Sequence, residues 1–116
     1  MSVKEVVRPI KSPSDDRDYR IITLPNNMQV ALVSDAETDK AATALLVNVG
    51  SSSNPKDCLG LAHFLEHMLF LGTEKYPDEG SYAATVNKYG GSRNAATGPE
   101  KTNYYFTVTP DHLEEM

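Results

Sequence analysis

Two histidines and one glutamate, His63, Glu66 and His67, stand within five consecutive residues and could together bind and use a zinc ion. In an α-helix, residues three and four positions apart are neighbours on the surface, so these three side chains would fall within an arc of about 100°. A catalytic zinc takes three protein ligands and keeps one position open for water, on which a nearby carboxylate can act as general base. The spacing therefore predicts His63 and His67 as zinc ligands and Glu66 as the base.

The segment around this motif is apolar, because from Leu59 to Leu71 the only polar side chains are the two histidines and the glutamate. A helix that is apolar nearly all round is typical of a buried helix. Burying an unsatisfied polar group costs about 2–7 kcal/mol, and a charge costs more, so these groups need a partner. A metal ion would serve all three. The alternative is a pair of core histidines hydrogen-bonded to the backbone or to Glu66.

Length and composition limit the remaining possibilities. A chain of 116 residues has room for one domain, and a net charge of −5 argues against a nucleic-acid partner. No apolar run approaches the roughly 20 residues of a membrane span, and the first residues lack the apolar region of a secretory signal. Cys58 is the single cysteine, so no disulfide can form within the chain. We therefore expect a cytoplasmic protein with no membrane partner.

The pattern of β-formers, turn residues and helix caps predicts an α+β fold, mainly an antiparallel sheet covered by helices. Residues 1–18 read as a flexible lead-in, and residues 19–116 read as an incomplete domain that carries the zinc motif. The expected elements are a hairpin of 20–24 with 28–33, a strand 42–49, a helix capped by Asp57 and stopping at Gly72, a second helix between Pro77 and Gly90, a hairpin of 92–97 with 102–109, and a final helix from Pro110 that breaks off at Met116.

The motif and its surroundings resemble the insulinase/pitrilysin family of zinc metallopeptidases, whose inverzincin signature is His-x-x-Glu-His. The resemblance covers about residue 19 to the end and is closest to the insulin-degrading enzyme-like type. It rests on four segments: Gly60 to Thr73, Lys75 to Pro77, Gly91 to Ala95 and Thr102 to Phe106. It implies that the chain corresponds to the truncated N-terminal portion of an insulinase-type peptidase domain.

The resemblance also implies roles for particular residues. His63 and His67 would bind Zn²⁺, and Glu66 would activate the attacking water and return its proton to the leaving amine. Peptide substrates would bind as an added edge strand along 93–97, which assigns substrate binding to Arg93, Asn94, Ala95 and Ala96. For Asn94, a role as a turn residue beside Gly90 and Gly91 is an equal alternative.

The family's third zinc ligand is a glutamate on a later helix, which would lie beyond residue 116. The leading hypothesis is therefore a zinc metalloendopeptidase in the form of an N-terminal fragment that is weak or inactive alone. Its partner would be the remainder of a longer peptidase chain or a homologous subunit. Two alternatives remain: a non-catalytic, truncated metal-binding protein that associates with a full-length peptidase, and a metal-free interaction module with buried histidines.

Overall fold

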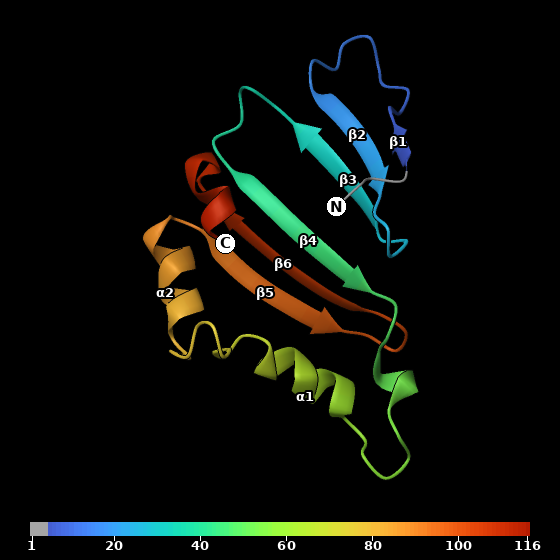
Figure 1. Cartoon of the computed structure of the whole chain (residues 1–116), viewed down its shortest axis with the longest axis vertical. Coiled ribbons are helices and arrows are strands. Elements are labelled where there is room, and N and C mark those ends of the chain that lie inside the picture. Colours follow the sequence, from blue (N-terminus) through green and yellow to red (C-terminus); the bar gives the residue numbers. More distant parts are fainter. Residues whose placement is uncertain (1–4) are drawn as a thin grey trace. The chain divides into compact units, whose positions relative to one another are not determined.

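The computed structural model describes residues 5–116, which fold as two compact units. The first unit ends at Thr38, and the second runs from Asp39 to Met116. Figure 1 shows the strands and helices of each unit.

The first unit is a three-stranded antiparallel sheet in the order β1-β2-β3. Its strands are β1 (Glu5–Val7), β2 (Asp18–Thr23) and β3 (Gln29–Ser34). The turn between β2 and β3 contains Asn27 at a φ of 66°, a left-handed conformation that asparagine tolerates better than most residues. The hairpin predicted for 20–24 and 28–33 is therefore present, with bounds shifted by one or two residues.

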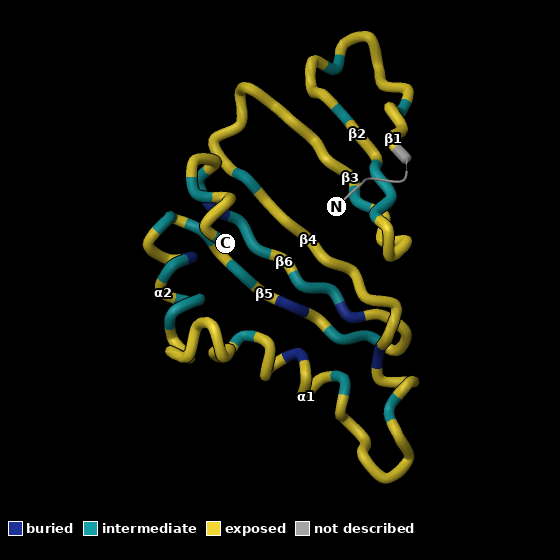
Figure 2. Tube along the Cα trace, viewed as in Figure 1, coloured by how far each residue is buried: buried dark blue, intermediate teal, exposed yellow. Residues whose placement is uncertain are grey.

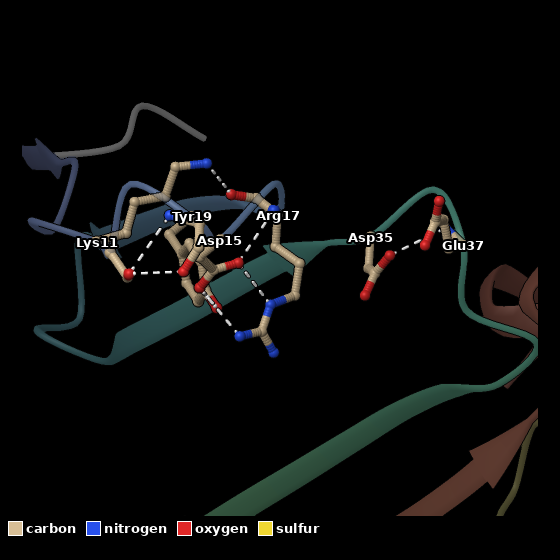
Figure 3. Close-up of polar contacts among 8 residues, drawn as sticks. Lys11, Asp15, Arg17, Tyr19, Asp35 and Glu37 are labelled. Atoms are coloured by element: carbon tan, nitrogen blue, oxygen red, sulfur yellow. Dashed lines mark hydrogen bonds and ion pairs between the residues drawn. The ribbon is translucent and has the colours of Figure 1, made fainter.

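A network of polar side chains orders the loop between β1 and β2 (Figure 3). Asp15 Oδ1 accepts a hydrogen bond of 2.8 Å from Arg17 Nε, and Tyr19 donates its hydroxyl to Asp15 Oδ2 at 2.8 Å. The Arg17 hydrogen bond, followed by that of Tyr19, holds the pKa of Asp15 well below its usual range. Lys11 Nζ donates to the Arg17 carbonyl on the same loop.

Part of the segment 1–18, predicted as a flexible lead-in, has defined structure. Glu5–Val7 form a strand paired with Ile21–Thr23, and the loop that follows β1 is internally hydrogen-bonded. Short apolar runs such as Val6-Val7 carry too little periodicity to be recognised as a strand from sequence, because their pairing depends on a distant partner. Residues 1–4 lie outside the described part of the chain. The division at residue 19 stays a prediction.

The second unit is an antiparallel sheet in the order β4-β6-β5, with two helices beside it (Figure 1). The strands are β4 (Ala41–Val47), β5 (Ser92–Thr97) and β6 (Thr102–Val108). The helices are α1 (Leu61–Met68) and α2 (Ser81–Lys88), and two 3₁₀ turns are η1 (Ser51–Ser53) and η2 (Pro110–Glu115). Helix α1 contacts β5, and α2 contacts β5 and β6. The predicted α+β class with antiparallel sheets is confirmed.

The register of the strands shows which side chains lie on the sheet face that the helices contact. Ala95 and Leu45 both pair with Tyr104, from opposite sides of β6. Residues directly opposite each other on paired strands share a face, so these three side chains lie on the same side of the sheet. Among the described residues, the buried apolar core is small and consists of Val86, Ala95 and Val108. Buried segments are dark blue in Figure 2.

The β4 side of the same face is open because the helices contact the other two strands. A groove of about 490 Å³ runs between β4, β6 and α1. Its lining is mostly apolar and includes Leu45, Val47, Val49, Leu65, Leu69 and Phe106. Leu65 on α1 and Leu69 just after its last residue are 52% and 57% exposed, so α1 and its C-terminal end present an apolar flank to solvent in this chain.

The helices differ from the predictions in extent and burial. Helix α1 is shorter than the predicted segment ending at Gly72, and Phe64 on it is 63% exposed, so the expectation of a fully buried helix was wrong. An apolar composition indicates that a helix needs covering, but it does not show whether this chain supplies the cover. Helix α2 begins at Ser81 rather than near Pro77. The final segment is a 3₁₀ helix, in keeping with its short length.

Gly50 holds the loop before α1 against the β5–β6 turn. A Cβ at this position would lie 2.3 Å from the Gly98 carbonyl oxygen and 2.6 Å from that of Pro99. We expect Gly50→Ala to lower the free energy of unfolding by at least about 2 kcal/mol, since backbone atoms cannot give way as side chains do. Urea unfolding measures this change.

Gly80→Ala is the matched control for this experiment. A Cβ at Gly80 would meet nothing closer than Asp78 Oδ1 at 3.4 Å, so stability should stay within about 0.5 kcal/mol of the wild type. Equal effects of the two substitutions would contradict the close backbone approach at Gly50.

Candidate metallopeptidase site

The loop before α1 determines where the helix that carries the His-Glu-His motif begins. Gly60 precedes the helix at a φ of 89°, in the left-handed region that glycine adopts without strain. Asn54 Oδ1 accepts a 2.9 Å hydrogen bond from the Ala62 N–H, one of the amides that the first helical turn leaves unpaired. Asn54 therefore provides the side-chain acceptor at this helix start, where Asp57 was predicted to do so.

His63 and His67 converge on one another from successive turns of α1. Their Nε2 atoms are 3.0 Å apart, and their ring centroids are separated by 4.8 Å. Both residues are exposed. The helical spacing predicted from sequence therefore brings two imidazole nitrogens to one point at the surface of the second unit.

Glu66 lies beside this pair but points into the protein. Its exposed fraction is 6%, and Thr97 Oγ1 on β5 donates a hydrogen bond to Glu66 Oε2. Tyr104 lies near the same carboxylate: burial raises the pKa of the Tyr104 phenol, and the negative charge of Glu66 adds to the increase. The ligating atoms of His63, Glu66 and His67 all lie within 4.8 Å of one another.

The donor set fits zinc. Zinc bound to two imidazole nitrogens at about 2.0–2.1 Å with a tetrahedral angle would place those nitrogens about 3.3 Å apart. The observed 3.0 Å differs by little, so small rotations of the rings would admit the ion. Within residues 5–116, no other group of three histidine, cysteine or acidic side chains gathers closely enough to hold a metal.

The four predicted substrate-binding residues all lie on β5, which is an edge strand of its sheet. Ala95 is buried and Ala96 exposed, while the side chain of Asn94 accepts a 2.9 Å hydrogen bond from the Ala95 N–H. The Arg93 guanidinium lies over the rings of Phe70 and Tyr82, at 5.8 and 5.7 Å from their centroids. The side chains of Arg93 and Ala95 therefore face the helices, and any role at the edge would belong to their backbone.

Sequence reasoning missed Thr97 and Tyr104 as neighbours of the glutamate. Thr97 is 31 positions away from Glu66, and the pairing of α1 with β5 is not encoded in any local spacing. The one available signal was alternation along β5, which puts Thr97 on the same face as Arg93 and Ala95.

Comparison with known proteins places this geometry in a family. The family described as "Insulinase (Peptidase family M16)" matches residues 29–116. Human insulin-degrading enzyme is 53% identical over 104 residues, which cover 90% of this chain and 10% of that protein. The insulin-degrading enzyme homolog of Dictyostelium discoideum is 50% identical over 112 residues, or 97% of this chain and 12% of that protein.

Solved structures agree with the sequence comparison. The crystal structure of pitrilysin matches with a TM-score of 0.89 and 42% identity, covering 96% of this chain and 12% of that chain. A protease from Helicobacter pylori matches with a TM-score of 0.74 and 30% identity, covering 84% and 23%. A relative from Schizosaccharomyces pombe, 54% identical over 99 residues, has the words zinc protease in its name.

The chain belongs to the insulinase family of peptidases. It spans about a tenth of the length of human insulin-degrading enzyme and of the Dictyostelium discoideum homolog, and it corresponds to an N-terminal part of such a peptidase. Within residues 5–116, no helix is long and apolar enough to cross a membrane.

The geometry predicts one zinc ion bound through the two histidines of α1. We expect His63→Ala and His67→Ala each to weaken zinc binding at least about tenfold, because either change removes one of the two imidazole ligands and no other histidine or cysteine among the described residues joins the group. Competition against a chromophoric chelator measures the affinity.

His112→Ala is the matched control, because His112 is the third histidine of the chain and lies elsewhere. Its ring stacks on Tyr89 at 3.6 Å, and its Nδ1 lies 3.0 Å from Glu115 Oε1. Zinc affinity should not change in this variant. A loss equal to that of His63→Ala would show that the ion binds elsewhere.

Proposed function

We propose that this chain is the zinc-binding, base-carrying part of a zinc-dependent metalloendopeptidase that hydrolyses bonds in peptides and small proteins. The observation that carries the proposal is the convergence of the His63 and His67 nitrogens at 3.0 Å beside a buried, hydrogen-bonded Glu66. Bound zinc would supply Lewis acidity and a water of lowered pKa at this point. His63 and His67 would hold it, and the cofactor of the proposed reaction is therefore Zn²⁺.

Glu66 would move the proton in this mechanism. Thr97 engages Oε2, which leaves Oε1 to take a proton from the attacking water and return it to the leaving amine. The low exposure of Glu66 separates this carboxylate from bulk water, which favours proton transfer to a bound reactant over exchange with solvent.

Strand β5 would align the peptide. It is an edge of the β4-β6-β5 sheet and contacts α1, so a peptide added to that edge would run beside the motif helix. Main-chain hydrogen bonds from residues 93–96 would hold the peptide with little dependence on its sequence, and pockets for alternate side chains would give selectivity. Peptides bound in extended form are therefore the proposed substrates.

The second proposed partner is the remainder of a longer peptidase chain, or a homologous subunit. The open groove beside β4 exposes an apolar flank of α1, which in water favours covering by another apolar surface. Arg93 Nε is buried and has no hydrogen-bond partner among the described residues, so an acceptor on the covering segment would satisfy it. Such a segment could also bring the third zinc ligand. A cytoplasmic location is part of this proposal.

A specific observation also favours a second candidate function. With Glu66 used as the base, the described residues gather only two zinc ligands, one fewer than a catalytic site requires. The chain by itself would then be a non-catalytic metal-binding protein that associates with a full-length peptidase.

Two forms of the protein separate these candidates. One is the 116-residue chain alone, and the other is a chimera in which it replaces the matching N-terminal segment of human insulin-degrading enzyme. We predict that the chain binds zinc with little or no hydrolysis and that the chimera hydrolyses a fluorogenic peptide. Glu66→Gln in the chimera should lower kcat by at least about 100-fold with zinc retained, because the amide cannot accept the proton.

Glu79→Gln is the control for that variant, since Glu79 is an exposed glutamate outside the motif, and its activity should match the parent chimera. Unchanged turnover in Glu66→Gln would end the base assignment. A chimera that folds and binds zinc without hydrolysing peptide would favour the non-catalytic candidate.

Edge-strand binding predicts a dependence on the substrate backbone. A peptide with N-methyl groups on alternate amides beside the scissile bond cannot donate those hydrogen bonds to β5, so its KM in the chimera should rise at least about tenfold. The same peptide methylated on the intervening amides is the control. If both peptides kept the parent KM, substrate would not be held as an added strand.

A further inference from the structure

The carboxylate of Glu66 is held from a different element of the fold. Thr97, the last residue of β5, donates its hydroxyl to Glu66 Oε2. Among the described residues, Thr97 is the only hydrogen-bond donor to this carboxylate, which is 6% exposed. A hydrogen bond to an ionised acceptor is among the stronger ones in proteins, so this single contact largely determines how the carboxylate is oriented.

Thr97 is itself fixed independently of α1. It pairs with Thr102 across the β5–β6 ladder, and Thr102 is 4% exposed and donates its hydroxyl to the Val49 carbonyl at 2.8 Å. The following turn is closed by the Gly98 N–H, which donates to the Lys101 carbonyl at 2.8 Å.

The turn is also tied to η1. The Ser51 N–H donates to the Gly98 carbonyl at 2.9 Å, on the loop that leads to α1. A β-branched side chain has few χ1 rotamers, so a rigid backbone at Thr97 fixes the direction of its hydroxyl.

From this geometry we propose that Thr97 is a positioning residue for the general base. The inference rests on the proposed function, because it assigns Glu66 the proton transfer. Thr97 occupies one carboxylate oxygen and turns the other toward the water, and it does so from the strand proposed to align the peptide. The same strand, β5, would then position both the peptide and Glu66. The carboxylate of Glu66 would therefore stay aligned with the scissile bond.

A purely structural role for the same contact predicts a different pattern. If Thr97 only satisfied a buried charge, its loss would lower stability, and the remaining folded enzyme would turn over normally. A positioning role predicts that kcat falls in the folded, zinc-loaded enzyme while KM changes little, because substrate contacts are kept and the base is misaligned.

The kinetic test uses Thr97→Val, which keeps the shape of the side chain without its hydroxyl, and Thr97→Ser, which keeps the hydroxyl. In the chimera, Thr97→Val should lower kcat about 10- to 100-fold, with KM within about twofold and zinc content unchanged. Thr97→Ser should stay within about threefold of the parent. Thr107→Val is the control, with kcat expected within about threefold of the parent, because it removes a hydroxyl of the same hairpin that contacts Ser92 and not Glu66.

A second measurement on the 116-residue chain needs no activity. Thr97→Val should raise the unfolding equilibrium constant about tenfold when residue 66 is glutamate, and less than about threefold when Glu66→Leu has removed the acceptor. If Thr97→Val does not fold, Thr97→Ser and Thr97→Ala, which differ by one hydroxyl, replace it in both measurements.

The outcomes separate this inference from the function on which it rests. Full kcat in Thr97→Val, together with loss of hydrolysis in Glu66→Gln, would overturn the positioning role and leave the peptidase proposal intact. Equal effects of Thr97→Val with and without Glu66 would show that the contact is not formed. Hydrolysis that survives in Glu66→Gln would instead reject the base assignment itself.

Discussion

The burial of one carboxylate is the constraint on which the site depends. Glu66 projects from α1 toward the sheet, and its charge requires a hydrogen-bond donor there. Thr97 supplies that donor from β5. Because Glu66 is fixed inward, the orientation of α1 about its own axis is fixed as well. His63 and His67, on the adjoining face of the helix, are therefore directed to the surface.

The same rotation explains the uneven covering of the sheet. With α1 against β5, its leucine flank faces the open β4 side, where the groove lies. The chain thus combines a well-determined motif with an incompletely covered apolar layer. The chain spans about a tenth of the length of human insulin-degrading enzyme. Under the proposed function, one covering segment would fill the groove and bring the third zinc ligand. The segment that covers the sheet would then also complete the metal site.

Local patterns in the sequence predicted what depends on local geometry. The β5–β6 hairpin has its predicted bounds to within one residue, because its turn residues and alternating strands are contiguous. The approach of His63 to His67 follows from helical periodicity alone. Contacts between distant segments could not be predicted, and these include the Thr97–Glu66 hydrogen bond and the pairing of β1 with β2. The exposure of Phe64 was missed for a related reason, since an apolar helix indicates a need for covering and not its source.

X-ray absorption at the zinc edge of the zinc-loaded chain tests most directly whether His63 and His67 hold one zinc ion side by side. If they do, the spectrum should show two imidazole ligands with zinc–nitrogen distances of about 2.0–2.1 Å, and one imidazole fewer after His63→Ala. The remaining shell would be oxygen. A spectrum without histidine scattering, or one unaffected by His63→Ala, would contradict the account.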